Sequence, residues 1–547
     1  MSSTLTAARG APRRSGSVRA TVTCASHQGL CRIIYLGYKT YEQRGRDDGG
    51  WDARRAGSAL FRPGGHHRGD SEPAARPPRP RGPEREQRTH QVTGPAGRRC
   101  PSRGVPRSGA RRGRTGRARQ GLRGRARGVP RGQGADLFVS TPDTPLAGLR
   151  IVECATFVAG PSGGMALAQL GAEVIRVDLP QGGGDHGRWP VAPNGTSLYW
   201  NNLNKGKRSV ALDFRAPEGR ELLAALATAD GPANGIYLDN VAGRTRLRYE
   251  ELAERRRDVI HVHVQGKPDG KPAVDYTANA EVGVPDMTGP QDHAAPVNHV
   301  LPAWDFLTGM TAATGVLAAL HRRAATGEGS GITVALSDVA LAAVGNLGWL
   351  AEARLAGRGR PRHGNHTFGS FGVDFPTADG RRVMVLALTP GQWDALCAAT
   401  GTTKVFTALE PVFDADLSTE SDRYRLRDTI EAILRPWFEG RGLTEIGERL
   451  DRARVLWGPY RDTHEAATLA LADPGSIVTE IDQPGVGAMV AAAGPLRWSG
   501  STQPPRPAPL LGTDTDEVLS RYLGLSAAEL GRLHDAGLVS GPTESQH

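Results

Sequence analysis

Asp305 is the residue of this 547-residue chain whose type and surroundings most clearly suggest chemistry. It follows an apolar, proline-containing approach, NHVLPAWDF, and it opens an Ala/Leu/Gly-rich stretch in which we expect a helix from near Phe306 to about Ala325. Aspartate is a preferred helix N-cap residue, and the spacing alone favours that structural role. The functional alternative is a carboxylate nucleophile that the helix end keeps ionised.

A glycine-rich loop, AGPSGG, joins an expected strand to an expected helix and invites a nucleotide interpretation. Gly160 precedes Asp178 by 18 residues, close to the spacing of the ribose-binding acid in NAD-dependent enzymes. The glycines do not form a GxGxxG pattern, however, so an NAD-dependent oxidoreductase is disfavoured. Two alternatives are close packing of the helix on the sheet and an adenosine-phosphate ligand at the helix N-terminus.

Other polar residues offer weaker signals. The segment NNLNKGKRS, from Asn201 to Arg208, fits either a phosphate or carboxylate site or a solvated basic loop. His261 and His263 alternate with apolar residues and so face one side of a strand, and without a third ligand nearby a structural role is favoured over a metal site. Cys154 and Cys397 belong to no CxxC pattern, which favours a reduced, cytoplasmic location and no metal.

The elements that must position these residues alternate between strand and helix signals from Pro145 onward. Helices are expected at 159–172, after Pro217 and at 249–258. Short apolar runs rich in β-branched residues predict strands at 149–155, 173–178, 208–214, 235–240, 259–266 and 332–337. This order predicts an α/β fold, a doubly wound and mostly parallel sheet with a second, smaller α+β domain.

Composition divides the chain further. A large Rossmann-like domain is expected at 145–357, a linker at 358–365 and a small domain at 366–495. The small domain should contain a hairpin around Ala378-Asp379-Gly380 and helices near 390–400 and 425–450. The last segment, 496–547, follows a proline-rich stretch, and we expect it to pack back on the large domain.

Residues 1–136 carry most of the positive charge. They hold 30 Lys and Arg against 9 Asp and Glu, so the rest of the chain has a net charge of −10 although the whole chain has +11. Their Arg/Gly/Pro-rich composition predicts disorder, with a nucleic-acid-binding arm or a transit peptide as alternatives. The net charge is therefore no argument for a nucleic-acid-binding fold, and no run of 18 apolar residues suggests a membrane span.

Four longer stretches, taken together, resemble the successive signatures of family III CoA-transferases of the CaiB/BaiF type, over about 145–540. They are VECATFVAGPSGGMALAQLGAEVIRVD, NKGKRSVALDFRAPEGRELL, WDFLTGMTAATGVLAALHRRAATGEG and PLLGTDTDEVL. The motifs RWPV, LNKGKRS, VDYT, MTGP, VNHVLPAWD and GNHTFGSFGVDF are similar to those of the branch that isomerises 2-methylfumaryl-CoA (mesaconyl-CoA).

The resemblance implies site residues. Asp305, with Gly309, fits the D-x-x-x-G segment of the family and would be its nucleophile. A mobile lid would correspond to the loop with Gly364, Gly369 and Gly372. The contacts with CoA would fall on Val158, Ala159, Leu212, Asp213, Phe214, Arg215, Asn240, Arg244, Asp275 and Tyr276. An interlocked homodimer is implied, with an acyl-CoA as substrate and no separate cofactor.

The implied reaction is an intramolecular transfer that converts 2-methylfumaryl-CoA to 3-methylfumaryl-CoA through an aspartyl-CoA thioester. An intermolecular transfer between two acids is the alternative. Two departures from the family stand out: Asp514 in GTDT replaces the His of the usual G-E-H-T, and the bulky Phe368 and Phe371 are expected to shape the acyl pocket.

Overall fold

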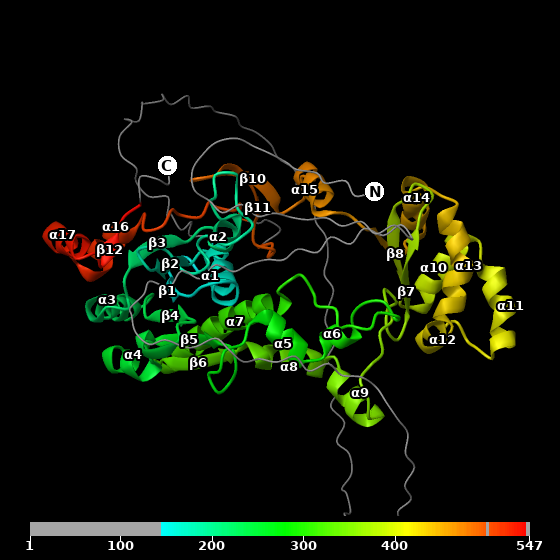
Figure 1. The fold of residues 1–547 in the computed structure, drawn as a ribbon, viewed down its shortest axis with the longest axis horizontal. Coiled ribbons are helices and arrows are strands. Elements are labelled where there is room, and N and C mark those ends of the chain that lie inside the picture. Colours follow the sequence, from blue (N-terminus) through cyan, green and yellow to red (C-terminus); the bar gives the residue numbers. More distant parts are fainter. Residues whose placement is uncertain (1–143, 499–502, 543–547) are drawn as a thin grey trace, which may run out of the picture. The chain divides into compact units, whose positions relative to one another are not determined.

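The computed structural model describes residues 144–498 and 503–542, so the expectations for 1–136 lie outside the described residues. In the described chain a seven-stranded sheet has the order β12-β3-β2-β1-β4-β5-β6 (Figure 1). Its strands are β1 (Arg150–Cys154), β2 (Glu173–Asp178), β3 (Arg208–Leu212), β4 (Ile236–Asp239), β5 (Ile260–Gln265), β6 (Ser330–Ala335) and β12 (Val539–Ser540). All neighbours pair in parallel except β12, which runs antiparallel to β3. The predicted doubly wound, mostly parallel sheet is confirmed.

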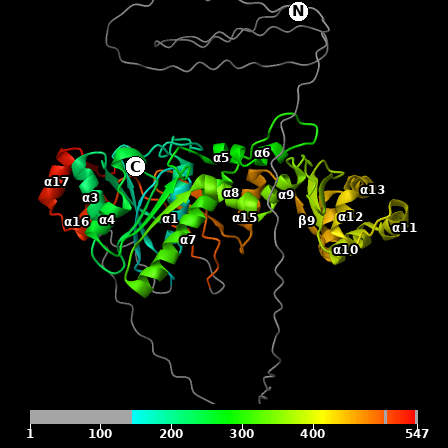
Figure 2. The ribbon, with the colours of Figure 1, turned by 90° about the horizontal axis from the view of Figure 1, so that it is seen from below.

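The strands are apolar on both faces because helices cover both faces. One face packs against α1 (Ala159–Gln169) and α7 (Ala303–Thr326). The opposite face is covered by α3 (Pro217–Ala227), α4 (Tyr249–Arg255), α16 (Thr515–Leu523) and α17 (Ala527–Asp535), as Figure 2 shows.

Helices α1 and α7 cross at two glycines. A Cβ atom on Gly309 would lie 2.1 Å from Ser162 Oγ, and one on Gly163 would lie 2.7 Å from the Gly309 carbonyl oxygen. Neither position has room for a side chain, so the backbones approach closely. Since Asp305 lies one turn before Gly309, this crossing places Asp305 near the beginning of α1.

Helix α7 is long and apolar enough to cross a membrane by length and composition alone. Its buried face, which includes Ala312, Val316 and Ala319, belongs to the core beneath the sheet. The apolar character of α7 is therefore accounted for by packing along β5 and β6.

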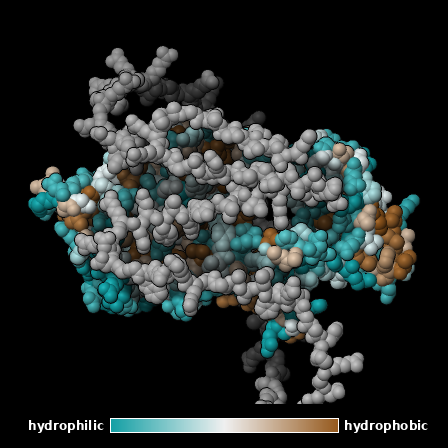
Figure 3. Space-filling view, in the orientation of Figure 1, coloured by the Kyte–Doolittle hydropathy of each residue, from teal (hydrophilic) through white to brown (hydrophobic). Residues whose placement is uncertain are grey.

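The smaller unit has a three-stranded antiparallel sheet, β7 (Phe371–Pro376), β8 (Arg382–Ala387) and β9 (Leu456–Pro459), in the order β7-β8-β9. The expected hairpin is present between β7 and β8. Its helices are α10 (Pro390–Thr400), α11 (Thr403–Phe413), α12 (Glu420–Arg425), α13 (Arg427–Glu439) and α14 (Leu443–Ala453). Helix α11 leaves Val405, Val412 and Phe413 exposed, and an apolar patch covers this end of the unit in Figure 3.

Glycines separate two pairs of successive helices. The helix expected over 425–450 is α13 and α14, which are separated by a turn that contains Gly440 and Gly442. Beyond β6, α8 (Leu336–Asn346) ends before Gly348, whose φ of +77° starts α9 (Trp349–Ala356) in a new direction.

The C-terminal residues return to β3 through α15 (Thr463–Ala472) and the hairpin of β10 (Val478–Gln483) and β11 (Gly487–Ala492). Asp514 accepts hydrogen bonds from Arg208 Nε at 3.0 Å and from the backbone nitrogen of Ser209 at 2.8 Å. The hydroxyl of Thr515 accepts one from the backbone of Ala211 at 3.0 Å. In this chain position 514 therefore anchors the C-terminal segment to the sheet.

Candidate active site

Asp305 lies in the first turn of α7, but it does not cap the helix. The N-cap residue is Pro302, which provides no side-chain cap. The carboxylate of Asp275, at the start of α5 (Asp275–Glu281), accepts hydrogen bonds from the backbone nitrogens of Trp304 at 2.7 Å and Asp305 at 3.2 Å. The N-cap interpretation of Asp305 is therefore wrong, and its carboxyl group is not used to cap the helix.

The environment of Asp305 changes its acidity. Partial burial, together with the negative charge of Asp275, raises the pKa of Asp305 to about 7, and the nearby Arg188 only partly offsets this. A carboxylate with a raised pKa is more basic than usual, and a more basic carboxylate is a better nucleophile.

A closed set of hydrogen bonds holds the first turn of α7. His299 Nε2 lies 2.7 Å from Asp275 Oδ1, and Trp304 Nε1 donates to Asn279 Oδ1 at 3.0 Å. Asn279 in turn donates to Asn298, whose side-chain oxygen also accepts from the backbone of His299. The position of Asp305 is thus set by α5 and by the loop before α7.

Arg188 and Tyr199 were missed by the sequence analysis. Arg188 lies in the loop before α2 (Leu198–Leu203), and its guanidinium carbon is 5.4 Å from the ring centres of both Phe157 and Tyr199. It is exposed, and among the described residues no carboxylate lies at ion-pair distance from it. Burial raises the pKa of Tyr199 to about 12, with smaller effects from Arg188 and Asp305. The motif RWPV contains Arg188, so a signal for it was available.

The turn between β1 and α1 is held from both sides. Phe157 has a φ of +65°, rare for a residue with a side chain, and its backbone nitrogen donates to Asp185 Oδ2 at 2.8 Å. The side chain of Asn240, after β4, bonds both the nitrogen and the carbonyl oxygen of Thr156, at 3.0 and 2.9 Å. The geometry of this turn thus depends on residues of two neighbouring connections.

Below the turn lies a buried ionic network. Arg176 contacts Glu153, Asp178 and Asp185, and Lys207 Nζ donates to Glu153 at 2.7 Å and to the Pro161 carbonyl oxygen at 2.9 Å. Burial raises the pKa of Glu153 and lowers that of Lys207 to about 8.

The cations of the NNLNKGKRS segment are used within the protein. Lys207 and Arg208 are only 2% and 1% exposed, and their charges face Glu153 and Asp514 respectively. Both sequence interpretations, an open phosphate or carboxylate site and a solvated loop, are wrong for these two residues. The signal was ambiguous because their partners lie far away in the sequence.

Most of the residues expected to contact CoA lie where strands end, whereas Asp275 and Tyr276 begin α5. Val158 and Ala159 begin α1, Asn240 follows β4, and Arg244 lies in the 3-10 turn η1 (Gly243–Thr245). Asp213, Phe214 and Arg215 follow β3. The crevice outside the carboxyl ends of the strands is where open α/β sheets bind ligands. Their contact with CoA stays a prediction.

Some of these side chains have other partners. Leu212 is fully buried in the core, Asp213 pairs with Arg215 at 2.9 Å, and the Tyr276 hydroxyl donates to the Val300 carbonyl oxygen at 3.0 Å. Asp275 is 1% exposed and turned toward α7. Leu212 is 0% exposed, so it presents no accessible surface to a ligand in this structure.

The lid glycines differ in conformation. Gly364 and Gly369 have φ values of +60° and +79°, whereas Gly372 lies within β7. Phe368 packs on Tyr424 and under the guanidinium of Arg360. Among the described residues, no hydrogen bond joins this loop to Asp305.

Phe371 does not line an acyl pocket. Its side chain is fully buried in the core of the smaller unit, where it packs against Trp393. The expectation that it shapes the pocket is therefore wrong.

His261 and His263 have a third polar neighbour that the sequence did not reveal. Asp239 on β4 lies 2.5 Å from His261 Nε2 and 2.6 Å from His263 Nδ1. Burial acts to raise the pKa of Asp239, but these two hydrogen bonds outweigh it and lower the pKa. The premise that no third ligand lies nearby is therefore wrong; the three side chains hydrogen-bond one another, and the structural role stays a prediction.

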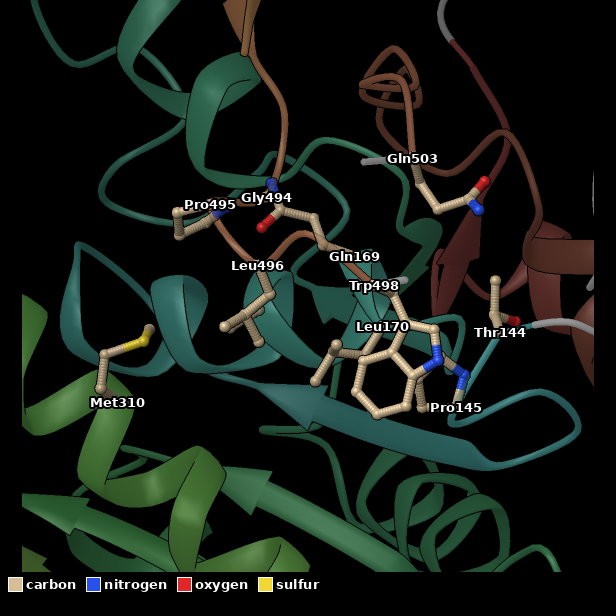
Figure 4. Close-up of a pocket in the computed structure, with 11 residues that line it drawn as sticks. Thr144, Pro145, Gln169, Leu170, Met310, Gly494, Pro495, Leu496, Trp498 and Gln503 are labelled. Atoms are coloured by element: carbon tan, nitrogen blue, oxygen red, sulfur yellow. The ribbon is translucent and has the colours of Figure 1, made fainter. Parts of the chain in front are cut away.

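A cavity of about 650 Å³ lies at the other end of α1 (Figure 4). Leu170, Met310, Leu496 and Trp498 are among its lining residues, and the described lining contains no acid or base. It offers apolar surface but no group for acyl transfer, so we assign the candidate active site to Asp305.

Comparison with known proteins shows the family to which this chain belongs. The model of CoA-transferase family III matches residues 146–515. The chain is 48% identical over 404 residues to 2-methylfumaryl-CoA isomerase of Chloroflexus aurantiacus, covering 73% of this chain and 98% of that protein. It is 28% identical over 392 residues to succinyl-CoA:mesaconate CoA-transferase of Haloarcula hispanica, covering 68% and 94%.

Among solved structures, a CAIB/BAIF family protein from Brucella suis matches with a TM-score of 0.57 and 25% identity, over 69% of this chain and 99% of that one. The sheet order, the crossing of α1 and α7 and the position of Asp305 lie within the matched range. The chain belongs to CoA-transferase family III.

Proposed function

We propose that this protein converts 2-methylfumaryl-CoA to 3-methylfumaryl-CoA by moving CoA between the two carboxyl groups of one diacid. The observation that carries the proposal is the carboxyl group of Asp305. It does not cap α7, because Asp275 does, and its pKa is raised by burial and by the charge of Asp275. The 48% identity to an isomerase of this name supports the choice of substrate.

The proposed reaction has two symmetric halves. The Asp305 carboxylate attacks the thioester carbonyl, which forms a mixed anhydride and expels CoA thiolate. The thiolate attacks the Asp305 carbonyl, which gives an aspartyl-CoA thioester and frees the diacid. The other carboxylate of the diacid then attacks that thioester, and the thiolate released attacks the diacid carbonyl. Asp305 is regenerated, with no net gain or loss of protons.

The diacid must stay bound between the two halves, because capture makes the second attack effectively unimolecular. Arg188 is suited to hold the carboxylate that is not reacting. A guanidinium binds a carboxylate through two parallel hydrogen bonds, and the rings of Phe157 and Tyr199 restrict its motion.

CoA itself would lie along the carboxyl ends of the strands, with phosphate near the start of α1 at Val158 and Ala159. The loop from Gly364 to Gly372 is the proposed lid, because an anhydride must be kept from water. CoA enters as part of the substrate, and we propose no separate cofactor or metal.

We also propose an interlocked homodimer. Helix α7 exposes Phe306, Leu307, Met310 and Leu317 on the side away from the sheet, and apolar side chains gathered on one helix suit a second copy of the chain. A cytoplasmic location agrees with the two free, buried thiols of Cys154 and Cys397.

Replacement of the proposed nucleophile should stop the reaction. We expect Asp305→Ala to lower kcat by about 10³-fold or more, because the covalent route is lost. Intact-protein mass spectrometry after hydroxylamine or borohydride trapping should mark Asp305 in the wild type only. The control is Asp338→Ala, an exposed acid in the first turn of α8, which should keep normal activity. Near-normal turnover by Asp305→Ala would contradict the mechanism.

The rate should depend on pH in one direction. Only the ionised carboxyl group attacks, and the pKa of Asp305 is raised to about 7. We therefore expect kcat/KM to rise from about pH 6 to about pH 8. The measurement is kcat/KM as a function of pH at constant ionic strength. A flat profile over that range would count against Asp305 as the nucleophile.

The intramolecular and intermolecular alternatives make different use of free acid. Isotopically labelled mesaconate is added while the enzyme turns over 2-methylfumaryl-CoA. If the diacid stays bound between the two halves of the reaction, the product should remain essentially unlabelled. Mass spectrometry of the product acyl-CoA measures this. Label that enters product as fast as product forms would show that free acid exchanges, and would favour the intermolecular transferase.

Arg188 should control retention of the diacid. In Arg188→Gln we expect label from free mesaconate to enter product and kcat to fall by about 10- to 100-fold, because the charged anchor is lost. Arg188→Lys keeps the charge without the two parallel donors, so its kcat and its uptake of label should lie between those of the wild type and Arg188→Gln. Arg354→Gln, on the exposed surface of α9, is the control. Unchanged retention in Arg188→Gln would exclude this role.

A further inference from the structure

The loop before α7 carries a histidine to which neither the motifs nor the relatives assign a role. The side chain of His299 is 22% exposed, and its Nε2 atom lies 2.7 Å from Asp275 Oδ1. Its ring also contacts those of Tyr276 and Trp304, at centre distances of 5.9 and 6.0 Å. We propose that His299 is a positioning residue for Asp305, which acts by holding the Asp275 carboxylate against the first turn of α7.

The two oxygens of Asp275 have separate tasks. Oδ2 accepts from the backbone nitrogens of Trp304 and Asp305, and Oδ1 accepts from His299. Asp275 is 1% exposed, so water cannot readily replace a lost partner. Without the donor on His299, Oδ1 would be buried and unsatisfied, and the carboxylate would gain by turning away from α7.

The helix has no other side-chain cap at this end. Pro302 at the N-cap position offers no side-chain acceptor, so the capping of α7 depends on Asp275. Because Asp305 is itself one of the two residues whose backbone Asp275 binds, a turn of the Asp275 carboxylate would move the nucleophile directly.

The charges around Asp305 make this position sensitive. Asp275 acts on it from α5, Arg188 from the loop before α2, and Tyr199 from α2, where Tyr199 also interacts with Tyr276. The hydrogen bond from His299 stabilises the negative charge of Asp275. That charge lies beside Asp305, whose carboxyl group must be ionised to attack. His299 therefore affects where Asp305 lies and how its charge is balanced, without touching the substrate.

Two substitutions separate the hydrogen bond from the packing. His299→Phe keeps a ring against Tyr276 and Trp304 but removes the donor, whereas His299→Gln keeps an N–H donor of similar reach. We expect His299→Phe to lower kcat by about 10- to 100-fold with KM within about threefold of wild type, because nucleophile alignment is lost. His299→Gln should recover most of the rate. His321→Phe, exposed on α7, is the matched control.

Coupling tests whether His299 acts through Asp275. Asp275→Asn should be strongly impaired, and adding His299→Phe to it should cost little more, because residues that act as one unit are not additive. Asp275→Asn should also shift the rising limb of the pH profile to lower pH, since the negative charge that raises the pKa of Asp305 is removed.

A measurement without substrate distinguishes this inference from the proposed function on which it rests. Hydrogen exchange of the full-length protein should be faster over residues 300–308 in His299→Phe than in wild type or His299→Gln. If wild type fails to turn over 2-methylfumaryl-CoA, the proposed function falls and the exchange data still decide the role of His299. The inference is overturned if exchange is unchanged, if His299→Gln behaves like His299→Phe, or if the Asp275 and His299 effects add.

Discussion

The site depends on one carboxylate that caps a helix it does not belong to. Asp275 binds the backbone of Trp304 and Asp305 from α5, so the first turn of α7 is completed without the side chain of Asp305. Burial is the largest cause of the raised pKa of Asp305, and the same charge that fixes the helix adds to it by repelling the Asp305 carboxylate. In the proposed reaction Asp305 becomes neutral when it is acylated. The repulsion then disappears, so the arrangement favours both a reactive carboxylate and a stable covalent intermediate.

The pair of Asp275 and Asp305 is supported by a helix crossing and by a buried ionic network. Gly163 and Gly309 let α1 and α7 approach until backbone meets backbone, which ties the start of one helix to the first turns of the other. Below, Arg176 and Lys207 share the carboxylates of Glu153, Asp178 and Asp185. Such buried charges are costly to separate, so the network specifies one geometry for the turn at Phe157. The turn at Phe157 and the carboxyl group of Asp305 are thus held by different interactions.

Local pattern predicted the six parallel strands of the large sheet and the long helix, because β-branched runs and apolar periodicity are local signals. It also drew attention to Asp305, although the spacing alone favoured an N-cap. It failed where the deciding partner is distant. Asp305 resembled an N-cap because the true cap is 30 residues away in the sequence. Lys207 resembled a ligand-binding or solvated cation because Glu153 is 54 residues away, and the third member of the His261 and His263 cluster lies 22 residues from His261 on the next strand. Only the packed sheet brings these pairs together.

In the proposed reaction, retention of the diacid depends on less of the fold than the position of Asp305 does. Asp305 and Asp275 are fixed by helix packing, and a change in either alters the core of the site. Arg188, in contrast, lies on a loop, its side chain is exposed, and its guanidinium lies against the rings of Phe157 and Tyr199. A loop residue can change without repacking the sheet. An enzyme that keeps its acid and one that releases it can therefore share the same carboxylate pair, and we expect the difference between them in the loop of Arg188, which we propose to hold the free carboxylate of the substrate.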